Sequence, residues 1–381
     1  MSYFDNNATT PLDAGARQVL FDAHTESWAN PSSPYRSSAQ IRASMQKCRD
    51  KISSSLGVDS DHLIFTSGAT EGNNSVFANL SRQVGSTARV LLSPYEHPSV
   101  SEAAHYWFSN RVDLLRAQSN GTICLEELAK CLKNSPSPCL VSVMAASNES
   151  GVLQPWREIE SLCRDHGVPY HCDSTQLPGK EDLKGLSNCS FHVVSAHKFG
   201  GPKGIGWLAG KRAASLLVGG EQEKGKRGGT ENYPAIVSAF SAWESKVQTP
   251  LDISKLKGYR DHFEEQMKNL FQDIKFIGKG SPRLWNTSLF IMPRFENLSW
   301  VGKLDKLGFQ VSTGSACSTT KVGASPIAQA LNLSDAETKR LIRVSSFQSH
   351  TQKDWSDLIS AFQQAAEELD NESAGSSVIS L

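Results

Sequence analysis

The feature that most constrains this chain is the alternation of short apolar runs with helical patterns over its first two thirds. Apolar runs that predict buried strands lie at 63–65, 90–92, 140–144, 168–171, 191–194 and 205–208. Helical patterns lie between them, at 72–82, 98–109, 125–134 and 155–166. Pro155 suits the first turn of the last helix, and Gly167 suits its stop. Such alternation predicts an α/β fold with a mostly parallel sheet covered by helices on both faces.

The pattern changes after about residue 250. A long helical pattern at 252–272 is followed by strand-like runs near 285–291 and 309–312 and by helical patterns at 325–332, 335–341 and 352–370. This mixture predicts a second, smaller α+β domain. We expect a large domain at 16–250, a small domain made of 1–15 and 251–370, and a mobile, Ser-rich tail at 371–381.

Composition excludes several classes of protein. Lys plus Arg and Asp plus Glu each number 39 in 381 residues, which argues against nucleic-acid binding driven by bulk charge. No apolar run approaches the ~18 residues of a membrane span, and the N-terminus shows no secretory pattern, so we expect a cytoplasmic protein. The eight cysteines are spread along the chain without a C-x-x-C pair, which is typical of reduced thiols rather than a disulfide framework.

Polar side chains follow five of the predicted strands. These segments, which carry small hydroxyls, carboxylates, an amide, two histidines and a lysine, are 66–71, 93–98, 147–151, 173–176 and 195–198. Ligands of open α/β sheets bind at the carboxyl ends of the strands. Each segment alone is a weak signal, since a strand-end Asp or Ser is usually a helix cap. Together they predict a polar site at one edge of the sheet.

This set of side chains suits pyridoxal 5'-phosphate. The cofactor needs a lysine for its Schiff base, a carboxylate beside the pyridine nitrogen and a phosphate cup. Lys198 supplies the lysine, and Asp173 supplies a carboxylate that keeps the ring nitrogen protonated. The segment 67–70 opens a helix, so the Ala69 backbone and the Thr70 hydroxyl suit the phosphate. Further candidates for contact with the phosphate or the ring are Ser195, His197 and His97.

Two glycine-rich segments are weaker signals. Gly220 to Lys226 lacks the Ser or Thr that a phosphate-binding loop needs after its lysine. Gly204 to Ala209 falls inside an apolar run rather than at a strand-to-helix turn. A nicotinamide enzyme is therefore the least favoured interpretation.

Short motifs that match one known family lie along almost the whole chain. They occupy 4–11, 30–33, 66–71, 96–97, 148–151, 195–198, 219–223, 227–232 and 312–318. Ser-Ala-His-Lys at 195–198 is typical of the class V aminotransferase superfamily as a whole. Gly-Ser-Ala-Cys-Ser at 314–318 is typical of a narrower group within it, the desulfurases. On these motifs the chain resembles the cysteine desulfurases of the NifS/IscS type. The resemblance implies fold type I, a seven-stranded-type sheet in the large domain and a homodimer with shared active sites.

The resemblance also implies a role for each matching residue. Lys198 resembles the Schiff-base lysine that shuttles protons, Asp173 the partner of the ring nitrogen and Gln176 the donor to the ring hydroxyl. Asn148 resembles the residue beside ring and substrate, and Arg343 resembles the clamp on the substrate carboxylate. The implied phosphate ligands are Thr70, Ser195, His197 and, from the other subunit, Thr230.

Cys317 resembles the family's nucleophile. The resemblance implies that its thiolate attacks the sulfur of L-cysteine, that a persulfide forms on it and that alanine leaves. Sulfur then passes to a protein acceptor such as an iron–sulfur scaffold. An ordinary thiol has a pKa near 8.5, so a base is needed, and His97 is one candidate. No resident metal is expected, and transient iron–sulfur ligation by Cys317 is analogy alone.

Several residues depart from the family pattern around the expected substrate. Tyr35 stands in place of His, Ser147 in place of Asn, and Ser174 and Thr175 in place of small apolar residues. After Arg343, the family's Ser-x-Gly becomes Ser-Ser-Phe at 345–347, and a basic residue becomes Gln348. These departures leave three alternatives open: a selenocysteine lyase, a cysteine lyase that makes pyruvate, or a catalytically degenerate, cofactor-binding interaction subunit.

Overall fold

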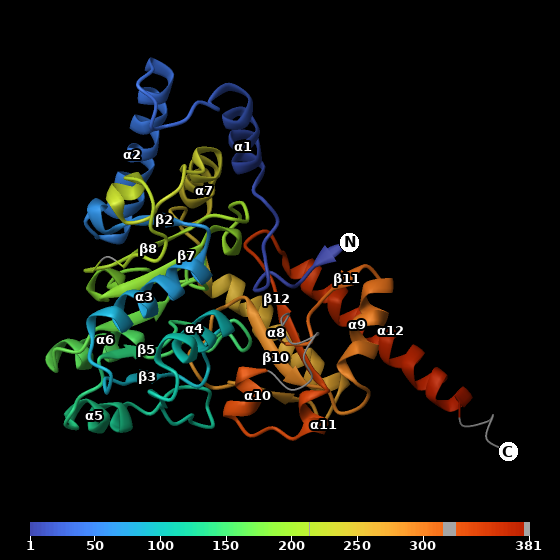
Figure 1. Ribbon diagram of the computed structural model, residues 1–381. Coiled ribbons are helices and arrows are strands. Elements are labelled where there is room, and N and C mark those ends of the chain that lie inside the picture. Colours follow the sequence, from blue (N-terminus) through green and yellow to red (C-terminus); the bar gives the residue numbers. More distant parts are fainter. Residues whose placement is uncertain (213, 315–324, 377–381) are drawn as a thin grey trace.

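The computed structural model describes residues 1–212, 214–314 and 325–376 (Figure 1). Its main layer is a seven-stranded sheet in the order β2-β8-β7-β6-β5-β3-β4. The strands are β2 (Ile64–Thr66), β3 (Val90–Leu92), β4 (Val112–Leu114), β5 (Leu140–Ser142), β6 (Tyr170–Asp173), β7 (Phe191–Ser195) and β8 (Gly206–Ala209). β8 runs antiparallel to both of its neighbours, and the other four pairings are parallel. The prediction of a mostly parallel sheet is confirmed.

Helices cover both faces of this sheet. The predicted helices are present as α3 (Ala69–Gln83), α4 (Pro98–Phe108), α5 (Leu125–Lys133) and α6 (Trp156–Asp165). Short 3-10 turns are η1 (Ser60–His62), η2 (Leu186–Asn188), η3 (Ala196–Lys198) and η4 (Gln222–Gly225). Separate clusters of buried apolar residues form on the two sides of the sheet, as expected for a three-layer arrangement.

Three further helices were not anticipated: α1 (Ala14–Glu26), α2 (Arg36–Leu56) and α7 (Tyr233–Lys246). The reason is clearest in α2, which buries a single narrow apolar stripe formed by Ile41, Met45, Cys48, Ile52 and Leu56. The rest of that helix is polar, so the periodic signal is weak. α1 and α2 both pack on α7, and together they form the upper part of the molecule in Figure 1.

The C-terminal part builds a smaller layer beside the main sheet. Its antiparallel sheet has the order β12-β10-β9, from β9 (Lys275–Phe276), β10 (Thr287–Ile291) and β12 (Leu341–Ser345). Its helices are α8 (Ile253–Leu270), α9 (Asn297–Lys306), α10 (Pro326–Ala330), α11 (Asp335–Thr338) and α12 (Gln352–Ser376). The N-terminal β1 (Ser2–Tyr3) pairs in parallel with β11 (Phe309–Gln310). Phe4 joins a separate apolar cluster otherwise drawn from residues 263–369.

One expectation for this part is wrong, and the helix before the expected tail is longer than predicted. The helix predicted at 335–341 ends at Thr338, and Leu341 begins β12, because every side chain of Leu341–Ser345 is buried and the strand pairs with β10. The tail predicted from residue 371 is helical as far as Ser376. Glu372 of this last stretch forms an ion pair with Lys303 on α9, which favours continuation of the helix. Residues 377–381 lie outside the described residues.

The N-terminal segment connects the two layers. It leaves β1, passes beside β12 and reaches the carboxyl ends of the main strands (Figure 1). Phe4 is buried in the smaller layer, whereas the Thr10 hydroxyl donates to the carbonyl of His197, 2.6 Å away, in the larger one. Among the described residues, no helix has the length and apolar character needed to span a bilayer.

Candidate functional site

A cavity of about 230 Å³ lies at the carboxyl ends of the parallel strands. It brings together nine residues singled out in the sequence: Ala69, Thr70, His97, Asn148, Asp173, Gln176, Ser195, His197 and Lys198. The other residues on its wall are Ala8, Ser99, Met144, Ala146 and Thr175. The predicted edge of the sheet is therefore where these side chains meet.

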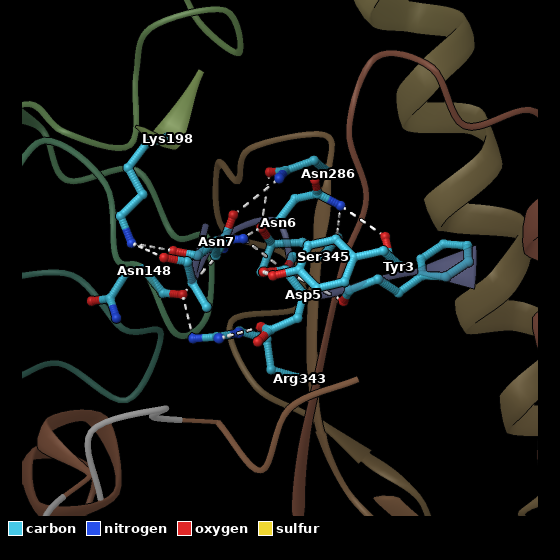
Figure 2. A network of polar contacts seen from close by, with 12 residues as sticks. Tyr3, Asp5, Asn6, Asn7, Asn148, Lys198, Asn286, Arg343 and Ser345 are labelled. Atoms are coloured by element: carbon cyan, nitrogen blue, oxygen red, sulfur yellow. Dashed lines mark hydrogen bonds and ion pairs between the residues drawn. The ribbon is translucent and has the colours of Figure 1, made fainter. Parts of the chain in front are cut away.

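Lys198 follows β7 and ends the short turn η3. Its Nζ donates to two backbone carbonyl oxygens, at 2.6 Å from Asn7 and 2.7 Å from Ala8 (Figure 2). Both acceptors belong to the N-terminal segment. The amine is thus held in place by a part of the chain about 190 residues away.

Asp173 is the last residue of β6 and is buried on the cavity wall. Asn73 Nδ2 donates to its Oδ2 at 3.2 Å, and the Thr175 N–H donates to its Oδ1 at 3.0 Å. A second carboxyl group, Glu96, lies near Asp173. Complete burial and the Asp173 charge raise the pKa of Glu96 well above its usual range.

His97 caps the N-terminus of α4 and faces the cavity. Its Nδ1 accepts the Ser99 N–H at 3.1 Å, which assigns the proton of the neutral ring to Nε2. Burial and the nearby Lys198 lower the pKa of His97, so the ring is neutral at pH 7. A neutral ring with this tautomer presents a donor to the cavity. This geometry suits His97 for contact with a cofactor ring or a hydrogen-bond acceptor. It suits His97 less well as a base that takes up a proton at Nε2.

A second depression adjoins the cavity near the N-terminus of α3 and suits an anion. Its wall includes Ser67, Gly68, Thr70, His197, Lys203 and Gly204. The Ala69 N–H donates to Ser195 Oγ at 2.7 Å, which fixes the first turn of the helix. Gly68 has a φ of +148°, and a Cβ there would lie 3.2 Å from Ser195 Oγ, so only glycine fits this approach. Burial and the cations of Lys198 and Lys203 lower the pKa of His197 to about 4.

Gln176 is oriented by a residue that the sequence analysis did not single out. Lys180 Nζ donates to Gln176 Oε1 at 2.6 Å, which turns the amide nitrogen of Gln176 toward the Asn7 carbonyl, 3.1 Å away. Burial, together with Lys198 and Arg343, lowers the pKa of Lys180 well below its usual range. The four-residue spacing between Gln176 and Lys180 was the only sequence feature that could have connected Lys180 with the site.

Arg343 does not line the cavity. It lies on β12, is 1% exposed and forms an ion pair with Asp5, with 2.6 Å between Nη2 and Oδ1. Its Nη1 donates to the carbonyl oxygen of Asn148 at 3.1 Å, so one residue separates it from the cavity (Figure 2). Nε is buried and has no hydrogen-bond partner among the described residues.

Thr230 and Cys317 are the remaining predicted residues. Thr230 is exposed and lines neither the cavity nor the adjoining depression. Cys317 lies outside the described residues. The remaining described His, Cys, Asp and Glu side chains form no group suited to hold a metal ion.

Most residues that depart from the family pattern form hydrogen bonds with backbone groups. Ser147 Oγ accepts the N–H groups of Glu149 and Ser150, each at 3.2 Å, and so closes the turn after β5. Ser174 Oγ donates to the Val193 carbonyl at 2.8 Å. Gln348 Nε2 donates at 2.8 Å to the carbonyls of Gly179 and Lys246. Tyr35 is exposed at the start of α2.

Thr175 is the exception among these departures, because it lines the cavity. Its Oγ1 is buried and has no hydrogen-bond partner among the described residues. A buried hydroxyl without a partner is costly, so this one points to a group that the cavity would hold. With the fixed carboxylate of Asp173, the amine of Lys198 and the anion-binding end at Gly68, the cavity fits pyridoxal phosphate.

Comparison with known proteins gives a consistent result. The aminotransferase class-V family model matches residues 2–358. Cysteine desulfurase IscS of Dictyoglomus turgidum is 32% identical over 342 residues, which cover 87% of this chain and 86% of that protein. Cysteine desulfurase NifS of Azotobacter vinelandii is 32% identical over 340 residues, with 87% and 84% covered. A NifS-like protein of known structure superposes with a TM-score of 0.85 at 27% identity, over 96% of this chain and 99% of the other.

Proposed function

The chain belongs to the class-V aminotransferase family, and from this membership we propose that it is a pyridoxal-phosphate-dependent cysteine desulfurase. It converts L-cysteine to L-alanine and passes the sulfur to an acceptor through a persulfide on Cys317. The observation that carries the proposal is that Lys198 and Asp173 face one cavity at the strand ends, beside a built anion site. Relatives named cysteine desulfurase, 32% identical across most of the chain, support it.

The chain's own residues position the cofactor and substrate. When bound, pyridoxal phosphate supplies a carbonyl group for the substrate amine and a ring that takes up the electron pair released at the α-carbon. The first turn of α3, with Thr70, Ser195 and His197, would hold the phosphate end, and Asp173 would hold the ring nitrogen. Lys198 carries the proton that is exchanged at the substrate α-carbon, and the carbonyls of Asn7 and Ala8 aim its Nζ.

The sulfur step uses Cys317. Its thiolate forms a bond to the substrate sulfur while the substrate Cβ–S bond breaks, and the sulfur remains as a persulfide. The thiol must first lose a proton, because only a few per cent of an ordinary thiol with pKa near 8.5 is ionised at pH 7. His97 is neutral at that pH, yet its Nδ1 is occupied by the Ser99 N–H and its Nε2 carries the proton. Proton acceptance by His97 therefore requires a change of tautomer.

Thr230 supports a homodimer with shared sites. It lies outside its own cavity, in an exposed segment, so a phosphate contact by Thr230 would be made in a second copy. Several large apolar side chains in neighbouring segments are exposed, namely Trp28, Tyr35, Leu217 and Val218. Pro34 and Glu231 line one depression, which brings the segment after Trp28 beside the Thr230 segment. A second copy that covers these side chains would remove exposed apolar surface and complete the site.

Substitution of Trp28, which is 79% exposed, tests the dimer. Trp28→Glu places a charge in the proposed interface and should give a monomer by light scattering, with weaker cofactor binding. Tyr106→Glu is a matched control, because Tyr106 is 77% exposed on a different helix, α4. A dimeric Trp28→Glu protein would contradict this assignment of the interface.

We propose that the acceptor is a protein that assembles iron–sulfur clusters. We also propose a cytoplasmic location, since reducing compartments keep thiols such as those of Cys317 and free cysteine available.

The proposed function is tested by measuring alanine, pyruvate and sulfide together when the purified holoenzyme receives cysteine and a reductant. Alanine and sulfide should appear in equal amounts. Cys317→Ala should reduce both by at least about a hundredfold, since it removes the nucleophile. Cys131→Ala is the control, because Cys131 is a half-buried thiol remote from the cavity on α5. Wild-type rates in Cys317→Ala would refute the persulfide step.

The same assay separates the alternatives. Pyruvate with sulfide would indicate a cysteine lyase and would remove Cys317 from the mechanism. A selenocysteine lyase would turn over selenocysteine much faster than cysteine. A protein that binds the cofactor yet turns over neither substrate would be the degenerate interaction subunit.

A further inference from the structure

The N-terminal segment from Phe4 to Asn7 lies along β12 as an extra, short strand-like stretch. The Ser345 N–H donates to the Phe4 carbonyl at 2.7 Å, and the Asn6 N–H donates to the Ser345 carbonyl at 3.0 Å. Asp5 and Ser345 form a parallel bridge. Because strand side chains alternate between faces, Arg343 lies on the same face of β12 as Ser345, and therefore on the same face as Asp5.

This pairing brings the Asp5 carboxylate to Arg343, the residue expected to bind the substrate carboxylate. Asp5 Oδ1 is 2.6 Å from Arg343 Nη2, and the Asp5 side chain is 19% exposed whereas that of Arg343 is 1% exposed. Nη1 is occupied by the Asn148 carbonyl, and only Nε lacks a partner among the described residues. The guanidinium thus already holds one carboxylate, through Nη2.

Asn7 continues the same segment into the cavity. Its carbonyl accepts from Lys198 Nζ, and its Nδ2 donates to the Asn148 carbonyl at 3.1 Å (Figure 2). The Asn148 carbonyl therefore receives hydrogen bonds from both Asn7 and Arg343. Four residues of one segment connect the expected carboxylate clamp with the amine at the reaction centre.

We propose that Asp5 is a specificity-determining residue, which occupies the carboxylate position of Arg343 until the α-carboxylate of an amino acid substrate replaces it there. This inference rests on the proposed function only for the identity of the substrate; the exchange at Arg343 applies to any α-amino acid. In this arrangement Asp5 competes with the substrate carboxylate for Arg343.

The physical reason is that a buried guanidinium needs an anion. Removal of one partner from a buried pair leaves an uncompensated charge, which is strongly unfavourable. Exchange of one carboxylate for another keeps the charge balanced, whereas an amine without a carboxylate leaves Asp5 in place. Release of Asp5 also removes one of the side-chain contacts that hold Phe4 to Asn7 against β12, and leaves those of Asn6 and Asn7 with Ser345 and Thr287. Substrate binding should therefore loosen the N-terminal segment.

The test compares cysteine kinetics of the wild-type holoenzyme with those of Asp5→Asn. Removing the competing charge should lower KM about tenfold, the size of one charge-assisted hydrogen bond, while kcat changes less. Asp113→Asn is the matched control, because Asp113 forms an exposed ion pair with Arg89 far from the cavity and should leave KM at the wild-type value. A KM that is raised or equal to wild type in Asp5→Asn would overturn the proposal and would indicate that Asp5 only orients Arg343.

A second measurement needs no variant. Hydrogen exchange of the peptide that covers residues 1–10 should become faster when L-alanine is added to the wild-type holoenzyme, and should stay the same with cysteamine, which has no carboxylate. Slower or unchanged exchange with L-alanine would overturn the proposal. If the protein releases no sulfide from cysteine but L-alanine still loosens the segment, the proposed function fails and this inference stands. If the protein releases sulfide from cysteine but L-alanine does not loosen the segment, the proposed function stands and this inference fails.

Discussion

The two ends of the site are built differently. At the cofactor end, Lys198, Asp173 and Ser195 each stand at or directly after the end of a strand of one sheet, and short local motifs surround them. At the substrate end, Arg343 meets Asp5 and Asn148, which lie 338 and 195 residues away in the chain. The cofactor end is already a cavity, whereas at the substrate end a side chain of the protein takes the place of a ligand.

This difference shows which part of the site has to rearrange. A rigid sheet edge can be formed before any ligand arrives, because its strands are buried on both faces. The substrate end lies between the two layers and depends on an ion pair that a ligand carboxylate replaces. Changes at the cofactor end should therefore abolish turnover, whereas changes at the substrate end should shift affinity, pH dependence or local order.

The largest expected effect is that of Lys198→Ala. Loss of the amine should reduce cysteine turnover by at least about a thousandfold, in the upper range for a general acid–base group. The fold should persist, because Lys198 Nζ bonds to backbone carbonyls that solvent can also reach through the cavity. Steady-state kinetics with circular dichroism would check both points. Lys211→Ala is the control, because Lys211 is an exposed lysine shortly after β8. Turnover within tenfold of wild type would remove Lys198 from the mechanism.

The next largest effect is expected for Asp173→Asn. The amide has nearly the same shape, yet it cannot balance a protonated ring nitrogen, so kcat should fall about a hundredfold. Titration of cofactor-free protein with pyridoxal phosphate should show weaker binding in the same variant. Asp182→Asn, on an exposed loop, should change neither quantity. If kcat were unaffected, the carboxylate would only be structural, through its bonds to Asn73 and Thr175.

The same contrast explains what the sequence could predict. Strand ends carry their polar residues next to an apolar run, so the segments at 66–71, 173–176 and 195–198 could be assigned to one edge from the sequence alone. The cavity contains these residues as expected. The fold class followed from the same alternation. The main error in the type of an element concerns β12: Leu341 was assigned to a helix, and the other four residues were assigned to no element.

The residues that sequence reasoning missed are joined by tertiary contacts rather than by spacing. Nothing in the first ten residues indicates that Asp5 pairs with Arg343 or that the Asn7 carbonyl accepts from Lys198. Lys180 reads as an ordinary lysine after a Gly, and only the fold reveals that it is buried. Arg343 was expected on the substrate side, but its separation from the cavity by Asn148 depends on how the two layers meet.

A pH-dependent effect is expected at the substrate end, at Glu149. This fully buried carboxyl group accepts from Ser325 Oγ and lies near Arg343; burial raises its pKa from 4.5 to about 7. Between these values the folded state keeps a proton that the unfolded state has lost. The free energy of unfolding should therefore fall with rising pH, by about 1.4 kcal/mol per pH unit relative to Glu149→Gln, between pH 5 and pH 7.

Urea denaturation of both proteins at pH 5, 6, 7 and 8 would measure this difference. Above pH 7 both states are ionised, so the two curves should run parallel. Glu265→Gln, at an exposed position of α8, should show no such divergence from wild type. Parallel curves for Glu149→Gln from pH 5 upward would mean that Glu149 does not hold a proton in the folded protein.

The smallest effect is expected for Thr175→Val. The substitution should weaken cofactor binding but stabilise the cofactor-free protein. Thr175 Oγ1 at the cofactor end and Arg343 Nε at the substrate end are both buried without a partner among the described residues. If the hydroxyl serves the cofactor, valine should weaken pyridoxal phosphate binding by about fivefold, the size of one net hydrogen bond. In cofactor-free protein the same change removes an unsatisfied polar group and should stabilise the fold by about 1 kcal/mol. Cofactor titration and urea denaturation of the free protein give the two values. Equal affinity in both proteins would show that Thr175 does not face the cofactor, and the cofactor end would then be complete without it.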